Sequence, residues 1–411
     1  MIRKSVDVAV IGGGPAGLAA AISAKKEGID NLLIIERDEF LGGILNQCIH
    51  EGFGLEIFKE ALTGPEYVQR FIDEAHALGI PVLLNSMVME MTGNRELVVS
   101  NEKGLHYIQA KAVVLSMGCR EKTRGMIRIP GERPSGIFKA GEAQHFINIG
   151  NYMIGKKVVI LGSGDIGLIM ARRLVLEGAE VLGVVEIMPY CGGLIRNRVQ
   201  CLEDFDIPLL FRHTVTNIEG RDRVESVTIA EVDGEGKAIE GTERTIECDT
   251  LLLSVGLIPE NELSKMADIV LDEATGGALV NENFMTSCEG IFACGNVLLV
   301  HDIVDFVTMD AYKTGKSVAL YAKNFLEEKP RIRIKPNQGI RFVVPQLVAQ
   351  EDVDVYMRVT EPGYGKEIEF RDGERVLKRV SQKQFAPSEM IRVKLNSDEM
   401  ENVKEITVMV T

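Results

Sequence analysis

Residues 6–43 place a glycine-rich turn after a short apolar run, and this order constrains the fold of the chain more than any other feature. The run Val6–Ile11 has the length and composition of a buried strand, and Gly12, Gly14 and Gly17 follow it in the spacing GxGxxG. In such a turn the first glycine permits a tight bend, and the second lets the backbone approach a pyrophosphate. The third lets the following helix pack closely on the strand. The stretch predicts a strand–turn–helix unit that binds a dinucleotide.

An acidic residue completes this unit. An alanine-rich helical segment ends at Gly28, and a second apolar run, Leu32–Ile35, closes on Glu36. A carboxylate about 20 residues after the glycines can accept hydrogen bonds from a ribose diol. The free N–H groups at the helix N-terminus favour phosphate at the same edge. The alternative, a tight strand–helix turn without a ligand, does not account for the acid.

The same arrangement occurs a second time. Four residues recur at a single offset of 150 positions, as Gly162, Gly164, Gly167 and Glu186. A shorter match, Ser116–Gly118 with Ser254–Gly256, continues the pattern at a slightly different offset. A shared offset indicates duplication of a whole module. We therefore expect two sites for two different dinucleotides, with electrons passing between the two bound cofactors.

Charge and cysteine content exclude several classes of protein. The net charge is −14, and residues 331–411 carry 14 Lys and Arg against 13 Asp and Glu, so the first 330 residues hold −15. An acidic body argues against nucleic acid and anionic membrane surfaces as partners. Seven cysteines without a CxxC pair indicate a reducing, cytoplasmic compartment and no metal cluster. The absence of an apolar stretch of about 20 residues predicts no membrane span.

The last 80 residues change in pattern. Short β-branched runs at 341–344, 354–359, 367–370 and 406–410 alternate with turns such as Pro362-Gly363. This spacing predicts a small β-sandwich. Its nearly neutral charge beside an acidic body fits a docking module that could be removed after Pro330 without loss of cofactor. A lid that buries apolar surface fits equally well.

A third motif identifies a family. Residues 286–296, TSCEGIFACGN, form an apolar strand that ends in Gly295-Asn296, and a helical pattern follows over residues 306–316. A first GxGxxG, a second near mid-chain and this late segment resemble two-domain FAD/NAD(P) flavoproteins of the pyridine nucleotide–disulfide oxidoreductase superfamily. Three stretches look like those of the NAD(FAD)-dependent dehydrogenases that accompany anaerobic glycerol-3-phosphate-dehydrogenase-type flavoproteins. They are LGGILNQCIHEGFGL, LGSGDIGLIMARRL and FACGNVLLVHDIVDF.

The resemblance implies an α/β fold with two Rossmann-like domains, one nested in the other, and a small C-terminal all-β domain. The FAD domain would comprise residues 1–122 and 260–330, the NAD domain 123–259, and the C-terminal domain 331–411. The residues implied for FAD are Gly12, Gly14, Pro15, Ala16, Gly17, Glu36, Arg37, Gly43, Val88, Gly118, Gly295 and Asn296. Those implied for the nicotinamide dinucleotide are Gly162, Gly164, Asp165, Ile166, Gly167, Glu186 and Gly256.

Two positions qualify this assignment. The family usually has Asp where this chain has Asn296; an amide can still accept from a ribityl hydroxyl, but it removes a negative charge beside the phosphates. Glu186 stands where NADP-binding members tend to place Arg. A carboxylate there hydrogen-bonds a 2′-hydroxyl and repels a 2′-phosphate, which favours NAD over NADP.

The chain departs from the disulfide reductases of the superfamily at the redox site. Those enzymes have CxxxxC after the first acid, whereas this chain has only Cys48 there, and its last histidine is His301. Dithiol exchange needs a resolving thiol, so we expect no disulfide reductase activity. Cys48 is either a small apolar residue beside the flavin or a peroxidatic thiol whose pKa His50 could lower. His50 and His301 are interpreted as structural or substrate-shaping.

These observations predict an FAD-dependent oxidoreductase that moves a hydride between NAD(H) and flavin, with a second flavoprotein or a small substrate as electron partner. Three alternatives remain open: an amine or opine dehydrogenase subunit, a Cys48-dependent NADH oxidase or peroxidase, and a nucleotide-sensing or assembly protein without catalysis. No motif apart from the cofactor sites identifies the electron partner.

Overall fold

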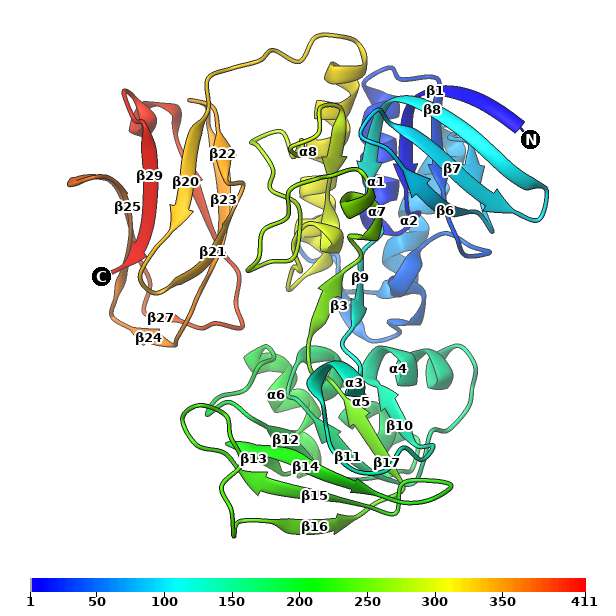
Figure 1. Cartoon of the computed structure of the whole chain (residues 1–411), viewed down its shortest axis with the longest axis vertical. Coiled ribbons are helices and arrows are strands. Elements are labelled where there is room, and N and C mark those ends of the chain that lie inside the picture. Colours follow the sequence, from blue (N-terminus) through cyan, green and yellow to red (C-terminus); the bar gives the residue numbers. More distant parts are fainter. Residues whose placement is uncertain (1) are drawn as a thin grey trace. The chain divides into compact units, whose positions relative to one another are not determined.

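The computed structural model describes residues 2–411, which divide into two compact units. Unit 1 contains the residues up to Cys119 together with Pro259–Thr411, and unit 2 contains Arg120–Ile258 (Figure 1). The chain passes between them in two short strands, β9 (Cys119–Glu121) and β18 (Leu257–Pro259). In the sequence, unit 2 is inserted between the two halves of unit 1.

Unit 1 is built on a seven-stranded sheet of order β5-β2-β1-β8-β7-β6, in which β19 also pairs with β8. The central pairs β2-β1-β8 are parallel, and β6 and β7 form an antiparallel meander with β8. The strands are β1 (Ile2–Ile11), β2 (Leu32–Ile35), β5 (Val82–Leu83), β6 (Met87–Met91), β7 (Glu96–Asn101), β8 (Gly104–Leu115) and β19 (Ile291–Ala293).

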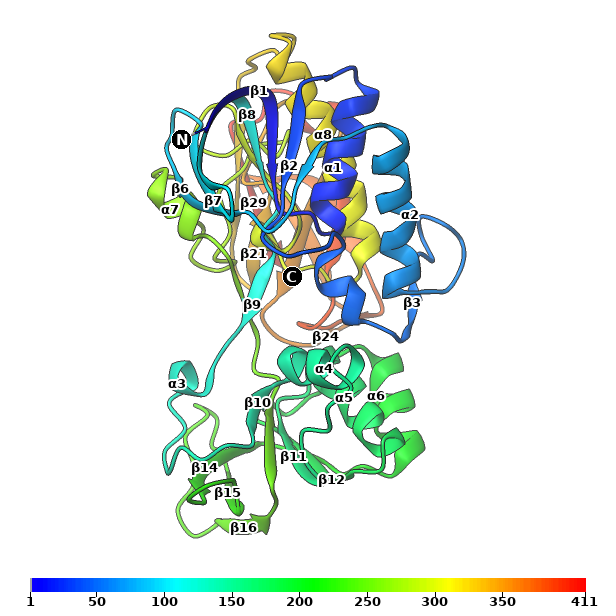
Figure 2. The ribbon, with the colours of Figure 1, turned by 90° about the vertical axis from the view of Figure 1, so that its right-hand side faces the viewer.

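Three helices cover one face of this sheet: α1 (Pro15–Lys26), α2 (Gly64–Ala77) and α8 (Val304–Ala322), as Figure 2 shows. Gly315 of α8 lies against α1, where a Cβ atom would come within 2.2 Å of the Ala20 carbonyl oxygen. This close approach of two helices explains why an alanine-rich segment and a glycine face each other here. On the other face, α7 (Glu262–Met266) packs with residues 278–299 in a second apolar cluster.

Short elements connect these layers in unit 1. They are η1 (Gly43–Gln47), β3 (Glu51–Phe53), β4 (Leu62–Thr63) and η3 (Gly295–Val297). A capping box begins α2, because the Thr63 side chain accepts from the Glu66 backbone N–H while the Glu66 carboxylate accepts from that of Thr63.

Unit 2 repeats this plan on a smaller scale. Its parallel sheet has the order β10-β17-β11-β12-β13, formed by β10 (Ile137–Lys139), β17 (Thr250–Leu253), β11 (Lys157–Leu161), β12 (Glu180–Glu186) and β13 (Leu209–Phe211). Helices α4 (Ala140–Asn148), α5 (Asp165–Leu176) and α6 (Ile195–Cys201) pack on one face. The meander β14 (His213–Glu219), β15 (Ser226–Glu231) and β16 (Arg244–Glu247) packs on the other. The turns α3 (Arg124–Ile127) and η2 (Glu203–Phe205) complete the unit.

Residues 331–411 form a β-rich domain with its own core. One sheet has the order β22-β20-β29-β25-β26, a second the order β21-β23-β28, and β24 pairs with β27. The strands are β20 (Ile332–Pro336), β21 (Ile340–Val344), β22 (Leu347–Val348), β23 (Val353–Val359), β24 (Gly363–Tyr364), β25 (Glu367–Asp372), β26 (Arg375–Ser381), β27 (Gln384–Phe385), β28 (Ile391–Leu395) and β29 (Glu405–Val410), with η4 (Ser397–Met400) before the last.

This C-terminal domain is not a detached module. Phe342, Val344 and Tyr356 belong to the apolar cluster that packs under the large sheet of unit 1. Hydrogen bonds add to the contact: the Gln346 side-chain oxygen accepts from the Val280 N–H at 3.0 Å, and the Gln346 N–H donates to the Val280 carbonyl at 3.2 Å. The domain therefore covers apolar surface of the rest of unit 1, as the lid alternative expects.

Candidate functional site

The first glycine turn has the geometry that a dinucleotide site requires. Gly12 has a φ of +104°, and a Cβ atom on Gly17 would lie 1.8 Å from the Gly12 carbonyl oxygen. A Cβ atom on Gly14 would meet nothing closer than Gly43 at 4.0 Å. The first and third positions are therefore closed by the protein itself, and the middle one is left open. This open position is the one at which a pyrophosphate would approach the N-terminus of α1.

The second turn, in unit 2, repeats the closed first and third positions, whereas a Cβ atom on its middle glycine, Gly164, would lie 3.2 Å from the Ser254 hydroxyl oxygen. Gly162 has a φ of +95°, and a Cβ atom on Gly167 would lie 2.7 Å from the Cβ atom of Ser254. Gly164 ends the turn as the N-cap of α5, as Gly14 does for α1. The helix in unit 2 starts at Asp165 and that in unit 1 at Pro15. The two turns are structural copies, as the common sequence offset indicates.

The two acids that end the second strands are buried and held by backbone. Glu36 is 6% exposed and accepts from the N–H groups of Gly13 (2.5 Å) and Asp38 (2.9 Å). Glu186 is 7% exposed and accepts from those of Ser163 (2.9 Å) and Met188 (2.8 Å). A carboxylate has about four acceptor positions, so each retains capacity for a ribose hydroxyl. The acids thus fix the glycine turns as well as offering a ribose contact.

Other residues implied for the first cofactor collect around this turn. The N–H of Gly42 donates to the Gly13 carbonyl at 2.9 Å, which lays Gly43 against Gly14. The backbone of Gly295 lies so close to Ala16 that a Cβ atom would come within 2.7 Å of it. The structure therefore brings the first glycine turn, the Gly42-Gly43 pair and Gly295 together at one edge of the large sheet.

Asn296 and Val88 have defined surroundings near this edge. The Asn296 amide oxygen accepts from the His301 N–H at 3.3 Å, which shapes the loop before α8. Val88 lies buried in β6, and Ser86, two residues earlier, donates its N–H to the Glu36 carbonyl at 2.9 Å. The start of β6 is thereby held beside the ribose acid, whereas Arg37 points to an exposed surface.

The residues implied for the second cofactor differ in how they are used. The Asp165 carboxylate accepts from the Leu194 N–H at 2.9 Å and from the Asn197 amide at 2.6 Å, so it anchors the start of α6. Its backbone N–H, with that of Ile166, lies in the first turn of α5 and is the part that could face a phosphate. Gly256, at φ +103°, and Gly118, at φ +74°, occupy matching turns after β17 and β8.

Three serines hold the glycine turns, and the sequence interpretation assigned them no role. The Ser116 hydroxyl donates to the Ile11 carbonyl at 2.8 Å, and the Ser254 hydroxyl accepts from the Gly167 N–H at 3.1 Å. Ser163 donates its hydroxyl to Glu186 at 2.5 Å and accepts from the Gly192 N–H at 2.7 Å. The repeated Ser-x-Gly after β8 and β17 was the signal in the sequence for the first two.

Cys48 lies in an environment that disfavours its thiolate. Its side chain is 5% exposed, its Sγ donates to the Ile44 carbonyl at 3.3 Å, and burial raises its pKa to about 12. His50 is turned towards the Glu51 carbonyl (3.3 Å) and stacks on Phe53 with ring centroids 4.9 Å apart. Neither arrangement is that of an activated nucleophile, which needs a depressed thiol pKa.

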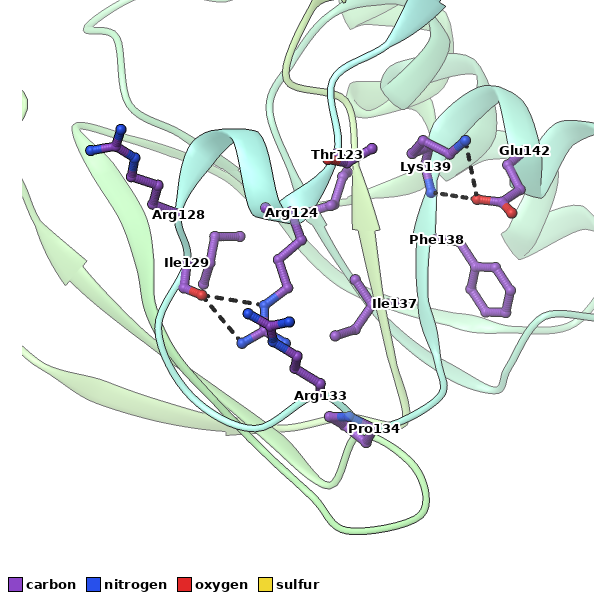
Figure 3. Close-up of a pocket in the computed structure, with 12 residues that line it drawn as sticks. Thr123, Arg124, Arg128, Ile129, Arg133, Pro134, Ile137, Phe138, Lys139 and Glu142 are labelled. Carbon is purple, nitrogen blue, oxygen red and sulfur yellow. Dashed lines mark hydrogen bonds and ion pairs between the residues drawn. The ribbon is translucent and has the colours of Figure 1, made fainter.

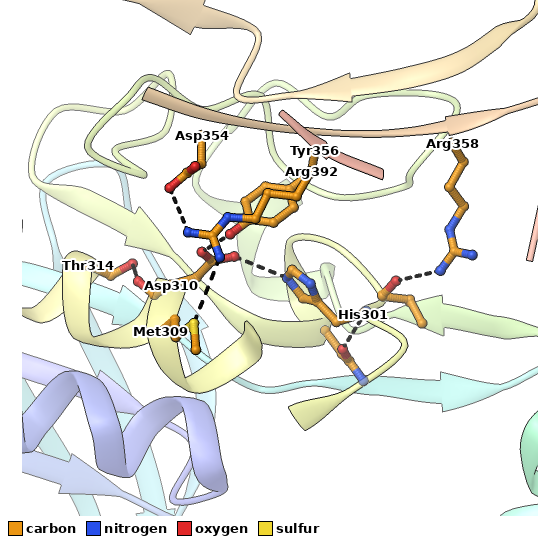
Figure 4. Close-up of polar contacts among 10 residues, drawn as sticks. His301, Met309, Asp310, Thr314, Asp354, Tyr356, Arg358 and Arg392 are labelled. Atoms are coloured by element: carbon orange, nitrogen blue, oxygen red, sulfur yellow. Dashed lines mark hydrogen bonds and ion pairs between the residues drawn. The ribbon is translucent and has the colours of Figure 1, made fainter. Parts of the chain in front are cut away.

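A buried polar cluster connects the late motif to the C-terminal domain (Figure 4). Nε2 of His301 lies 3.2 Å from Oδ2 of Asp310, and their side chains are 2% and 9% exposed. The Tyr356 hydroxyl donates to the other Asp310 oxygen at 2.6 Å, and its ring meets His301 edge to face. Burial, and then the Asp310 charge, raise the pKa of Tyr356, which therefore remains a donor. Beside them Arg358 pairs with Asp302.

Comparison with known proteins agrees with this geometry. A family model described as pyridine nucleotide-disulphide oxidoreductase matches residues 6–319. The chain belongs to this family. FAD and a pyridine nucleotide are the cofactors of the family, and the chain contains two copies of the glycine turn.

Individual relatives are more distant. The chain is 28% identical over 330 residues to the mitochondrial dihydrolipoyl dehydrogenase of Caenorhabditis elegans, with 72% of this chain and 64% of that protein covered. It is 27% identical over 285 residues to the hydrogen cyanide synthase subunit HcnB of Pseudomonas protegens, with 64% and 58% covered. The chain thus spans less than two thirds of the length of either relative.

A solved structure confirms the fold. The crystal structure of T. acidophilum thioredoxin reductase matches with a TM-score of 0.64 and 24% identity, over 78% of this chain and 99% of that one. This likeness concerns the arrangement of the elements alone. No helix in residues 2–411 is long and apolar enough to cross a membrane.

Proposed function

We propose that this protein is an FAD-dependent dehydrogenase that transfers a hydride between NAD(H) and flavin and exchanges electrons with a second flavoprotein subunit. The observation that carries the proposal is the duplicated cradle, in which each of two glycine turns begins at a glycine of positive φ, caps a helix and is held by a buried acid. Because the two cofactors carry out the two-electron transfer, a chain that binds both needs no acid–base side chains for that step.

The first cradle fits FAD, because only unit 1 adds the Gly295-Asn296 segment to its glycine turn. Gly14 and the N-terminus of α1 would hold the pyrophosphate, and Glu36 the adenosine ribose. When bound, the flavin supplies the hydride-accepting centre. The contribution of the chain is to orient the two cofactors and exclude water, and none of its side chains has to move a proton for hydride transfer.

The second cradle fits NAD better than NADP. Glu186 is buried and its charge is oriented by Ser163 and Met188, so a 2′-phosphate would meet a fixed carboxylate. Like charges at close range cost several kcal/mol, roughly a hundredfold or more in affinity, since about 1.4 kcal/mol corresponds to a factor of ten. The Glu186 carboxylate alone would therefore make the protein prefer NAD(H) to NADP(H).

Disulfide reduction is not part of the proposed function. Two observations support this: the sequence has no CxxC or CxxxxC pair, and burial raises the pKa of Cys48 to about 12. A thiol with such a pKa is almost entirely protonated near neutrality and is a poor nucleophile. The same pKa disfavours the Cys48-dependent oxidase or peroxidase.

The partner is proposed from resemblance and relatives. Three sequence stretches look like dehydrogenases that accompany glycerol-3-phosphate-dehydrogenase-type flavoproteins, and one relative is itself named as a subunit. The second candidate, an amine or opine dehydrogenase subunit, rests on the sequence resemblance alone. In either case the electrons of the flavin would leave to another subunit.

The test is an anaerobic reduction experiment on the purified chain. We expect about one FAD per chain, and bleaching by NADH at least about tenfold faster than by NADPH. Glu186→Gln should raise the KM for NADH while FAD content is unchanged, because an amide nitrogen cannot accept from Ser163 or Met188. A colourless protein that binds no added FAD would refute the proposal.

The partner is tested by co-expression with a flavoprotein of the glycerol-3-phosphate-dehydrogenase type. Glycerol 3-phosphate should then reduce the flavin of this chain in the complex, although it has no effect on the chain alone. Reduction by an amine or an opine instead would favour the second candidate.

A further inference from the structure

A cavity of about 610 Å³ opens in unit 2 at the carboxyl ends of β10 and β17 (Figure 3). Lys139 and Leu253, which end these two parallel strands and pair with each other, both line it. In open α/β sheets, ligands bind outside the carboxyl ends of strands. The cavity therefore has the location of a ligand site within the fold.

Positive charge gathers in this cavity. Arg124, Arg128, Arg133 and Lys139 line it, against one carboxylate, Glu142. Glu142 lies 3.7 Å from Lys139 and so compensates that cation. Among residues 2–411, neither Arg128 nor Arg133 lies within ion-pair distance of a carboxylate, and both are exposed. Unit 2 as a whole has 17 Lys and Arg against 20 Asp and Glu, so the cluster is a local feature.

Arg124 is held in a fixed position within the cluster. Its guanidinium donates to the carbonyls of Ile129 (3.2 Å), Pro130 (3.0 Å) and Gly131 (2.9 Å), and also to that of Glu132. Its pKa is lowered, first by burial and then by the charge of Arg133. Figure 3 shows the two guanidinium groups next to each other. Two like charges that act on each other without a carboxylate between them leave a place that an anion would stabilise.

The remaining wall of the cavity is apolar. Ile129, Ile137, Phe138 and Leu253 provide it, between the arginines and the end of β17. Sites for small organic ligands combine such an apolar lining with a few convergent polar groups. We propose that this cavity binds a small organic anion, a carboxylate or a phosphate monoester with an apolar body, whose charged end contacts Arg133 within the positive potential of Arg124 and Arg128.

The cavity is distinct from the expected position of a nicotinamide dinucleotide ribose. The strand order β10-β17-β11-β12 places the glycine turn after β11 and Glu186 at the end of β12. The cavity lies at β10 and β17, on the opposite side of β11 from Glu186. The arginines are therefore not placed to receive a 2′-phosphate beside Glu186. The proposal does not depend on hydride transfer or on the identity of the electron partner.

Calorimetric titration of the full chain tests the proposal with four probes: phenyl phosphate, benzoate, inorganic phosphate and benzamide. We expect phenyl phosphate or benzoate to bind at least tenfold more tightly than inorganic phosphate or the neutral benzamide. Whichever of the two anions binds more tightly identifies the charged group. Added salt should weaken this binding, since the arginines that make it are exposed.

Variants locate the binding. The double change Arg128→Glu and Arg133→Glu should weaken it at least tenfold, whereas Arg221→Glu, an exposed arginine of unit 2 outside the cavity, should change it less than twofold. Melting temperatures check that all variants fold. Undiminished binding by the double variant, or failure of both aromatic anions to bind the unaltered chain, overturns the proposal. Displacement by saturating NADH would also overturn it, as a sign that the cavity belongs to the dinucleotide site.

Discussion

The hydroxyl of Tyr356 donates a hydrogen bond of 2.6 Å to Oδ1 of Asp310 and so joins β23 of the C-terminal domain to the middle of α8. Both residues are buried, and His301 occupies the second carboxylate oxygen. Tyr356→Phe keeps the ring and removes only the hydroxyl. We expect it to lower the free energy of unfolding by about 2 kcal/mol, because a buried carboxylate loses a donor. Thermal unfolding should show a decrease of several degrees.

Tyr364 provides the control for this change. It lies in the same domain but is 72% exposed, and its hydroxyl accepts only from Gln384 at 3.3 Å. Tyr364→Phe should leave the melting temperature unchanged. Equal effects of the two substitutions would show that the Tyr356 bond adds nothing to stability.

Removal of the C-terminal domain should damage unit 1. Truncation after Pro330 would expose apolar surface that Phe342, Val344 and Tyr356 now cover, and it would leave Asp310 without its tyrosine donor. Each large side chain removed costs roughly 2–3 kcal/mol of burial. We therefore expect insoluble protein or a strongly reduced FAD content, measured as flavin absorbance per chain. A truncated protein that is soluble and fully yellow would instead show that the C-terminal domain is a separable module, which is one of the two alternatives from the sequence.

Cys48 should prove dispensable for flavin reduction. Cys48→Ala is expected to retain the rate of NADH-dependent bleaching within about twofold, because a buried thiol that remains protonated makes no covalent step. Loss of turnover, together with a long-wavelength absorbance band that the variant lacks, would instead make Cys48 a redox thiol.

The raised pKa of Cys48 also predicts a pH dependence. The pKa of the thiol is 9.0 in the unfolded chain, and burial raises it to about 12 in the folded chain. Folding thus favours the protonated form, and this contribution to stability is present below about pH 9 and is lost as the pH rises towards 12. At pH 8, alkylation mapped by mass spectrometry should spare Cys48 in the native chain and modify it in urea.

A pair of glycine substitutions should separate the two cofactors. Gly17→Ala places a Cβ atom 1.8 Å from the Gly12 carbonyl oxygen and should abolish FAD binding. Gly167→Ala places one 2.7 Å from the Ser254 Cβ atom and should leave the protein yellow while NADH reduction falls at least about tenfold. Dithionite should still bleach this second variant.

Gly234→Ala is the matched control, because its added Cβ atom meets nothing within 4 Å. It should leave both FAD content and NADH reduction unchanged. If Gly167→Ala removed FAD and Gly17→Ala spared it, the assignment of the two cradles would be reversed.

The α/β fold, the duplicated cradle and the β-rich C-terminal region could be predicted from the sequence because each depends on local chemistry. The strand expected at Val6–Ile11 lies within β1, and the strand expected at Leu32–Ile35 coincides with β2. The glycine spacing correctly predicted the turns that both units contain. The GxGxxG spacing and the acid about 20 residues after it can be read directly from residue type, because each of these positions has its own backbone or hydrogen-bonding requirement.

Tertiary structure alone decided what depends on groups distant in the chain. Asp310 and Tyr356 are 46 residues apart, and neither belongs to a motif, so their bond could not be predicted. The degree of burial that raises the pKa of Cys48 likewise comes from elements packed around it. The cationic cavity requires β10 and β17 to end side by side. Periodicity and residue type determine which elements form, but burial and charge neighbourhood arise only when these elements come together in space.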